Sequence, residues 1–205
     1  EAFDEALRRL EPKRGSVIAL ANAFIKLNEL DRALEVYTKG LELGVNDLDY
    51  QLADLEGRRG NYEGMIDASL RLMRAKPQYF RNVQNSFNRN LRIQDNPDLG
   101  DLLRSKLLRA AREYPEDTAL SELLVWYFNQ VNDFANAFVH AKSLDLRFRE
   151  SGERLIELAQ TATRNEDFAT AAQCYAYIAS KGPENAYFFT ARTQALKMQL
   201  RPLLN

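Results

Sequence analysis

Apolar residues recur at three- and four-residue spacing along almost the whole chain. Val17, Leu20, Ala21 and Phe24 form one such stripe, and a second runs through residues 123–131. This spacing is the period of an amphipathic helix, whereas a half-buried strand would alternate apolar and polar residues. The pattern therefore predicts an all-α chain, with helices of about 12 to 16 residues separated by short breaks.

The breaks between the predicted helices resemble one another. In four of them a polar turn precedes a Leu or aromatic residue that begins a new helix: Asn28-Glu29-Leu30-Asp31, Gly60-Asn61-Tyr62-Glu63, Asn132-Asp133-Phe134-Ala135 and Glu166-Asp167-Phe168-Ala169. A fifth copy fits near Gly100. From Ala33 through Met65, Leu103, Ala137 and Ala171, the spacings are 32, 38, 34 and 34 residues. A period of this length is typical of proteins built from helical repeats.

At these residues the chain resembles the tetratricopeptide repeat (TPR) family, which pairs two antiparallel helices in about 34 residues. The resemblance implies an all-α, right-handed superhelical solenoid of antiparallel helix pairs. It would form a single domain over 1–205, with a partial repeat at 1–12, repeats at 14–45, 46–77, 78–115, 118–149 and 152–183, and a terminal helix at 185–200.

Two details of the repeats are expected to depart from the family pattern. Extra residues around 95–98 predict a longer loop in the third repeat, and Glu56 replaces an expected aromatic residue in the second. In the terminal helix, Tyr187, Phe188 and Phe189 are expected to pack on the preceding repeat. Glu1 opens within a predicted helix, which suggests a piece of a longer protein.

The resemblance implies a concave groove lined by the first helix of each repeat. If Leu52 and Ala53 point into the stack, then Tyr50, Asp54 and Arg58 on the same helix face the groove. The same reasoning places Phe80, Val83 and Phe87 in the stack. The predicted groove residues are Tyr50, Asp54, Arg58, Arg81, Asn82, Asn85, Arg89, Glu122, Trp126 and Asn129. For Trp126 a place in the core is an open alternative.

Charge is distributed unevenly along the chain, although the total of 28 basic and 29 acidic residues leaves a net charge of −1. Residues 67–112 carry 10 basic and 4 acidic side chains, whereas the flanking segments 1–66 and 113–205 carry net charges of −4 and −3. Arg and Asn side chains on one face can bind carboxylates and peptide carbonyls. This predicts an acidic protein or peptide partner, although a solvated helix face is the alternative.

Composition argues against catalysis and against a metal or cofactor. The single cysteine excludes an internal disulfide and a multi-cysteine zinc site, and the single histidine excludes a two-histidine metal site. We expect His140 to be a surface or packing residue and Cys174 a small buried one. No apolar run approaches the roughly 18 residues that a membrane span needs. One cysteine suits a reducing or an oxidising compartment alike.

One specialised site of the TPR family, a clamp for C-terminal carboxylates, is not predicted. Arg81 and Asn85 could supply its first pair. Leu123 then stands where the clamp needs Asn, and Glu153 and Glu157 stand where it needs basic side chains.

The sequence therefore predicts a non-catalytic scaffold that binds an extended peptide or a partner surface in the groove. A repeat module of a larger enzyme or of an envelope-assembly protein is an alternative. RNA binding is another, although the basic residues are confined to little more than one repeat and nucleic acid is not favoured. The sequence gives no indication of oligomeric state.

Overall fold

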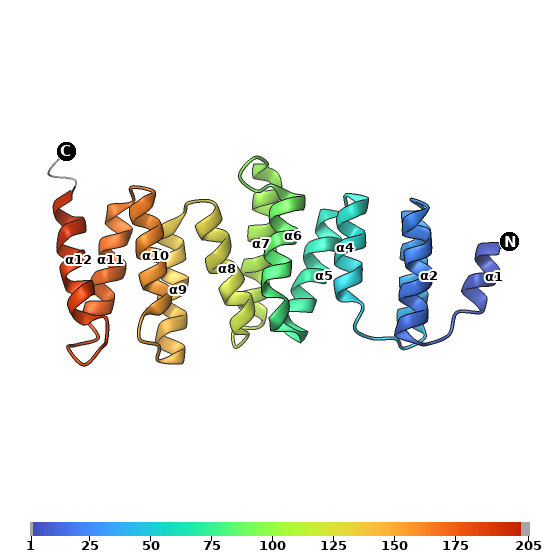
Figure 1. Ribbon diagram of the computed structural model, residues 1–205, viewed down its shortest axis with the longest axis horizontal. Helices are drawn as coiled ribbons and strands as arrows, with labels where there is room; N and C mark the ends of the chain where they lie inside the picture. Colours follow the sequence, from blue (N-terminus) through green and yellow to red (C-terminus); the bar gives the residue numbers. More distant parts are fainter. Residues whose placement is uncertain (1, 202–205) are drawn as a thin grey trace. The chain divides into compact units, whose positions relative to one another are not determined.

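The structure, a computed structural model, describes residues 2–201, so Glu1 lies outside the described residues. Within residues 2–201 the chain forms twelve α-helices, one short 3-10 helix and no strand, which confirms the all-α prediction (Figure 1). None of these helices combines the length and the apolar character needed to cross a bilayer. By its internal contacts the chain divides into two compact units, Glu1–Lys106 and Leu107–Asn205.

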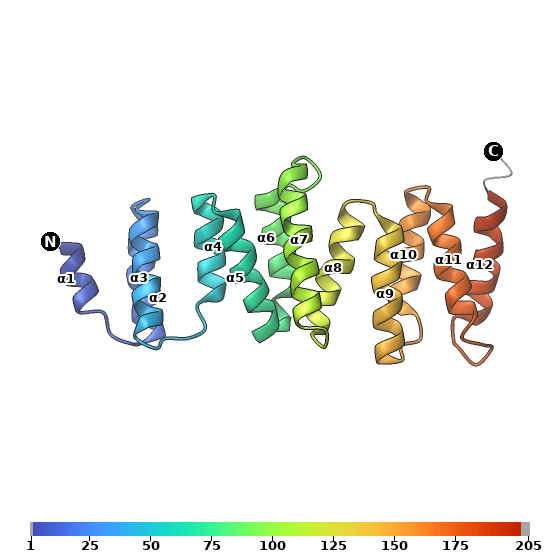
Figure 2. The same ribbon diagram turned by 180° about the vertical axis from the view of Figure 1, so that it is seen from behind.

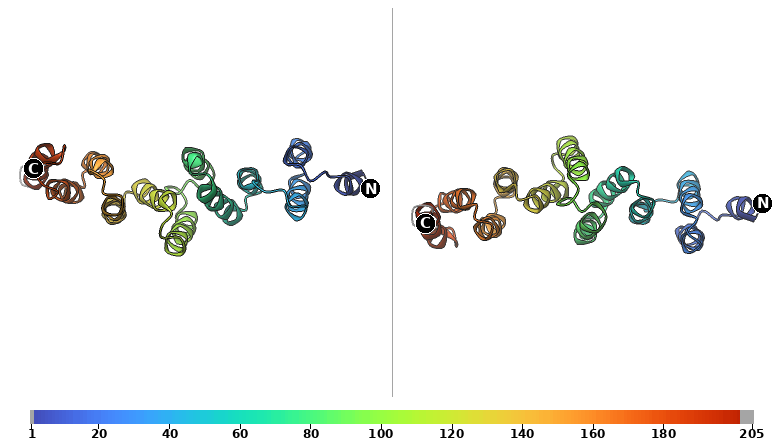
Figure 3. Two further views of the ribbon diagram at one scale, coloured as in Figure 1. Left: turned by 90° about the horizontal axis from the view of Figure 1, so that it is seen from below. Right: turned by 90° about the horizontal axis from the view of Figure 1, so that it is seen from above.

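The first unit is a succession of paired helices. Seen end-on in Figure 3, α2 lies beside α3 and α4 beside α5, and each pair is in close contact. The elements are α1 (Ala2–Arg8), α2 (Arg14–Lys26), α3 (Leu30–Glu42), α4 (Asp49–Arg59), α5 (Tyr62–Ala75), η1 (Pro77–Tyr79), α6 (Phe80–Leu91) and the first part of α7 (Pro97–Glu113).

The second unit repeats this arrangement. Its α8 packs on α9, α10 packs on α11, and α12 covers α11 at the end of the chain (Figure 2). The elements are the last part of α7, α8 (Thr118–Gln130), α9 (Phe134–Phe148), α10 (Glu153–Arg164), α11 (Phe168–Ala179) and α12 (Phe188–Leu200). The boundary between the units falls inside α7.

The similar breaks share one backbone design. After α8, Asn132 adopts a left-handed conformation (φ 57°), and the Asp133 carboxylate accepts the backbone N–H of Asn136 at 3.2 Å. The same left-handed residue and capping side chain recur at 60–61 and 166–167. Capping by Asn or Asp satisfies an N–H that the first helical turn leaves without an acceptor. Consequently α5, α9 and α11 begin at the Tyr or Phe predicted to start them. The helix α3 also begins at its predicted Leu30, although the side chain of Glu29 makes no capping hydrogen bond.

The third repeat has the longer loop that its spacing predicts. Arg92 ends α6 in the left-handed conformation (φ 44°), and α7 begins only at Pro97. The Asn96 side chain accepts the backbone N–H of Leu99 at 3.3 Å and so caps the new helix.

The residues from which the repeat spacing was read lie in the core of the helix pairs. The five register residues Ala33, Met65, Leu103, Ala137 and Ala171 are all completely buried. One expectation is wrong in part: Phe189 is 74% exposed, although Tyr187 and Phe188 are partly buried. The α12 helix can bury only one side against α11, and Phe189 lies on another side.

Polar contacts also repeat with the period of the sequence. The Arg14 guanidinium donates to the Asp47 carbonyl oxygen at 3.1 Å, across 33 residues, and the Asn185 amide donates to the Ser151 carbonyl at 2.9 Å, across 34. Each contact joins one helix pair to the next within its own unit. Neighbouring repeats are therefore linked by polar side chains as well as by apolar burial.

Candidate functional site

A cavity of about 200 Å³ lies in the first unit, and the helices α4, α5 and α6 all contribute to its wall. Most of the polar side chains come from α4 and α6, which are the first helices of two consecutive pairs, and α5 supplies the rest of the wall. The lining residues are Tyr50, Ala53 and Asp54 of α4, Ser69 and Leu72 of α5, and Asn82, Val83, Asn85, Ser86 and Arg89 of α6. The cavity thus combines a small apolar surface with hydrogen-bonding groups, as binding pockets generally do.

Five of the predicted groove residues line this one cavity. They are Tyr50, Asp54, Asn82, Asn85 and Arg89, which come from two helices separated in sequence by all of α5. Arg58 lies one helical turn beyond Asp54 and is exposed. Arg81 is exposed on α6 but is not part of the lining.

The charged groups around the cavity are unevenly paired. The Asp54 carboxylate accepts a hydrogen bond from the Arg58 guanidinium at 2.7 Å. On α5, Arg71 is paired with the Asp49 carboxylate at 2.8 Å. By contrast, Arg89 makes no ion pair or side-chain hydrogen bond with any residue in the described part of the chain. The uncompensated positive charge of this region therefore lies on α6.

Tyr50 supplies an aromatic edge to the cavity. Its ring is 43% exposed and contacts the ring of Tyr79, with centroids 5.4 Å apart and planes inclined by 50°. An exposed ring held by a second ring can bury apolar area against a partner with little loss of side-chain freedom.

Sequence reasoning missed Ser69, which is 1% exposed and lies on the cavity wall. Its hydroxyl makes no hydrogen bond with any residue that the structure describes. A buried polar group without a partner is unusual in a folded protein. Aligning the repeats could have drawn attention to this residue, because Tyr37 and Tyr175 occupy in their own helix pairs the position that Ser69 occupies here.

The other predicted residues, Glu122, Trp126 and Asn129, lie on α8 in the second unit. The Glu122 carboxylate accepts a hydrogen bond from Arg154 at 2.6 Å and is therefore already paired. Trp126 is partly buried. The Asn129 amide oxygen is buried without a partner in the described part of the chain.

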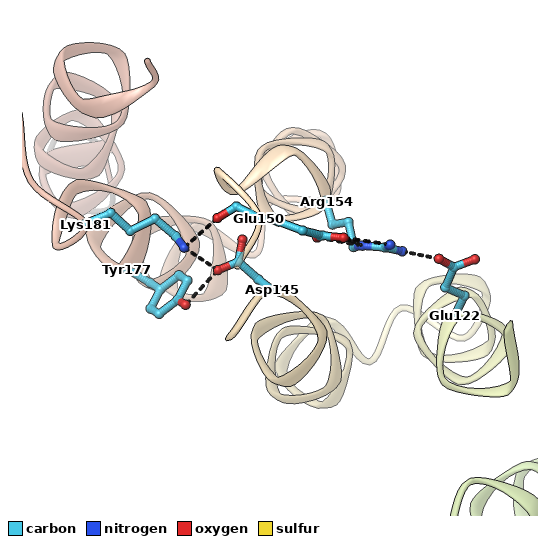
Figure 4. Close-up of polar contacts among 6 residues, drawn as sticks. All are labelled: Glu122, Asp145, Glu150, Arg154, Tyr177 and Lys181. Atoms are coloured by element: carbon cyan, nitrogen blue, oxygen red, sulfur yellow. Dashed lines mark hydrogen bonds and ion pairs between the residues drawn. The ribbon is translucent and has the colours of Figure 1, made fainter. Parts of the chain in front are cut away.

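Glu122 belongs to a polar network that links two successive helix pairs, α8–α9 and α10–α11 (Figure 4). Arg154 contacts both oxygens of the Glu150 carboxylate at 2.8 and 3.0 Å as well as Glu122. Lys181 donates to the Glu150 carbonyl oxygen at 2.9 Å and pairs with the Asp145 carboxylate at 2.5 Å. The hydrogen bonds to Glu150 and Glu122 together raise the pKa of the Arg154 guanidinium. This network ties repeats together, so we assign it a structural role.

Asp145 is the most buried member of the network, with no exposed surface. Its carboxylate accepts a hydrogen bond from the Tyr177 hydroxyl at 2.7 Å in addition to its ion pair with Lys181. Burial and the nearby carboxylate both raise the pKa of Tyr177, which therefore remains a donor at neutral pH. A buried carboxylate needs such partners to offset the loss of its hydration.

Cys174 is a buried free thiol on α11, and burial raises its pKa to about 12. A thiol in this state is a poor nucleophile and metal ligand, so the prediction of a small packing residue is confirmed. Among residues 2–201, no group of three or more His, Cys, Asp and Glu side chains could hold a metal ion.

Comparison with known proteins gives similarity at the level of structure. The structure of YrrB, "a TPR protein with an unusual peptide-binding site", is 18% identical, covers 94% of this chain and 98% of its own, and has a TM-score of 0.41. The structure of pilF from Pseudomonas aeruginosa is 20% identical, covers 99% of this chain and 94% of its own, and has a TM-score of 0.31. Neither a protein-family model nor a curated protein sequence matches the chain.

The repeats can be assigned from the chain's own features. The helix pairs recur at 32 to 34 residues, with one interval of 38 across the longer loop. The pairs α4–α5, α8–α9 and α10–α11 contain the same capped turn. Polar contacts across 33 and 34 residues join neighbouring pairs. Residues 2–201 are therefore an all-helical succession of repeated helix pairs.

Proposed function

We propose that the chain is a non-catalytic interaction scaffold that binds an extended, acidic peptide or an acidic partner surface on its first unit. The binding surface would be the cavity together with the exposed basic side chains of α6, and we call this surface the α4–α6 face. It comprises Tyr50, Asp54, Arg58, Arg81, Asn82, Asn85 and Arg89.

The observation that carries this proposal is the cavity itself. Its wall gathers polar side chains from two helices, and Arg89 stands at it without an ionic partner. Arg81 lies two helical turns before Arg89 on the same helix and is likewise unpaired among the described residues. Two guanidinium groups with free donors fit carboxylates and peptide carbonyls.

The proposal is tested by selecting ligands from a random peptide library and measuring their affinity by calorimetry. The double variant R81A/R89A should weaken binding at least about tenfold, because hydrogen bonds to charged groups contribute roughly 1.5–3 kcal/mol each. Neither side chain is buried, so circular dichroism should remain that of the native helices.

A matched control is R109A/R112A, which removes the same charge from exposed positions of α7 that do not line the cavity. This control should bind nearly as well as the original chain. Equal weakening in both double variants would show only a general charge effect, and no change in either would place the binding site elsewhere. Tight, steeply salt-dependent binding of single-stranded RNA, without peptide binding, would favour an RNA-binding repeat instead.

A further inference from the structure

The Ser69 position differs chemically from the equivalent positions of two other repeats. Tyr37 stands 32 residues before Ser69 and in the same place of its helix pair, and Tyr175 has that place in the last repeat. Both tyrosines are buried, with exposed fractions of 1% and 6%. Leu107 and Ala141 occupy the place in the remaining repeats.

The surroundings of Tyr37 show which charged side chains lie near this place in a repeat. Burial and the Asp54 carboxylate raise the pKa of Tyr37 to about 12, whereas Arg14 and Arg58 oppose that shift. Asp54 and Arg58 belong to α4, the first helix of the next pair. Tyr37 therefore lies within electrostatic reach of charged side chains on both α2 and α4.

The same geometry around Ser69 leads to the cavity. Asn85 and Arg89 stand 31 residues after Asp54 and Arg58, on α6, and both line the cavity together with Ser69. Serine occupies less space than tyrosine at this place, so the volume that a ring would fill is left open.

The polar groups at the cavity have a surplus of donors. The Ser69 hydroxyl is buried without a partner, and Arg89 has no ionic partner among residues 2–201. The carboxylate at the rim, Asp54, is already bound by Arg58 at 2.7 Å. Asn82 and Asn85 add amide donors. An occupant that supplies acceptor atoms and negative charge would satisfy these groups.

Size restricts the occupant further. The volume of about 200 Å³ is below the range of drug-sized ligand sites, which begins at roughly 300 Å³. Ala53, Leu72 and Val83 provide an apolar wall for methylene groups. The cavity therefore has room for one side chain with a short apolar stem and a carboxylate at its end.

We infer that this cavity is a specificity pocket for an Asp or Glu side chain of a bound peptide. The carboxylate would accept hydrogen bonds from Arg89 and Ser69, and the stem would lie against the apolar wall. This inference rests on the proposed function, because the pocket would read one residue of a peptide held on the α4–α6 face.

The direct test uses the full chain, labelled with 15N, and the probe acetyl-Ala-Glu-Ala-amide, whose blocked C-terminus leaves only the side-chain carboxylate. We expect shifts of the amide signals of Ala53, Ser69, Val83 and Asn85. The Gln analogue should bind at least about tenfold more weakly, since a charge-assisted hydrogen bond is roughly twice as strong as a neutral one. Equal binding of the Glu, Gln and Leu analogues, or no shifts at these amides with the Glu probe, would overturn the inference. The inference would also be overturned if the chain preferred peptides with a free C-terminal carboxylate, whatever their side chains.

Two variants of Ser69 distinguish the contribution of the pocket to binding from that of the rest of the α4–α6 face. S69Y should fill the cavity, as Tyr37 and Tyr175 do in their repeats, and abolish binding of the Glu probe without lowering the unfolding temperature. S69A keeps the space but removes the hydroxyl, so it should weaken the probe only several-fold. Undiminished binding to S69Y would refute the pocket.

The outcomes for the pocket and for the proposed function are distinguishable. If library peptides bind and R81A/R89A weakens them while S69Y leaves their affinity unchanged, the scaffold function stands and the pocket is wrong. If no peptide from the library binds the chain, the proposed function itself fails.

Discussion

His140 shows how one side chain takes its properties from the helix beside it. It lies on α9, and its ring stacks on that of Phe128 on α8, with centroids 5.4 Å apart and planes inclined by 8°. The ring is half-buried, and burial lowers its pKa below the ordinary value of 6.5 because the charged form loses hydration. The expected surface or packing role is therefore a packing role.

We predict that His140 titrates below pH 6.5 in the folded chain. Since the folded pKa is the lower one, this residue contributes stability above about pH 6.5 and loses that contribution as the pH falls through its folded pKa. It is the only histidine in the sequence, so the signal of its ring Hε1 proton can be followed in an NMR titration without overlap from another histidine. The same chain unfolded in urea serves as the control and should titrate near the ordinary value. A folded midpoint at or above the unfolded one would contradict the stacked, half-buried ring.

At the scale of helices, the crossing of α2 and α3 depends on the lack of a side chain at Gly40. A methyl group added at this glycine would lie 2.7 and 2.9 Å from the two γ-carbons of Val17. Val17 is completely buried and branched at its β-carbon, so it has little freedom to move aside. The two helices can approach this closely only because glycine stands at the crossing.

We predict that G40A lowers the stability of the first unit by about 1–2 kcal/mol, because overpacking outweighs the better helix propensity of alanine. The matched control is G15A on α2, where an added methyl group has no other group within 4 Å. G15A should leave stability unchanged or raise it slightly. Urea unfolding followed by circular dichroism compares the two, and equal midpoints for G40A and G15A would show that the crossing is not tight.

Much of the helix pattern was predictable because its causes are local. The turns at 60–61, 132–133 and 166–167 each pair a left-handed residue with a capping side chain. The capping Asn or Asp is visible in the sequence of all three turns, and a Gly or Asn suited to the left-handed conformation is visible in the first two. The longer loop before Pro97 followed from spacing alone. Such features depend on neighbours within a few residues, so periodicity and turn chemistry are sufficient to find them.

The candidate site was only partly predictable because it depends on contacts between repeats. Helical phase brought Tyr50, Asn85 and Arg89 into one predicted surface, but it gave no sign that Ser69 of α5 lines a cavity together with them. Nor did it reveal that Glu122 is bound by Arg154, which lies 32 residues further on. In each case the decisive neighbour comes from another helix pair, at a distance that a single helical wheel does not include.

For the molecule as a whole, the first unit has a cavity whose lining includes polar side chains unpaired among residues 2–201, whereas many polar side chains of the second unit are paired with each other. In the second unit, Arg154 pairs with Glu122 and Glu150, and Asp145 accepts a hydrogen bond from Tyr177, so these side chains form a network that links repeats. In the first unit, Arg89 and Ser69 meet at a cavity without partners in the described part of the chain. Asn129 and Asp145 of the second unit also keep a buried oxygen without a partner among the described residues. The assignment of binding to the first unit therefore rests on the cavity and on the unpaired Arg89.

The most direct test of this assignment is amide hydrogen exchange of the full chain, measured by mass spectrometry with and without the tightest peptide recovered from the library. Exchange is expected to slow in α4 and α6 on binding, with the second unit unchanged, because bound peptide restricts the local opening of the helices that it contacts. Slowing confined to α8 or to other helices of the second unit, with α4 and α6 unaffected, would contradict the account.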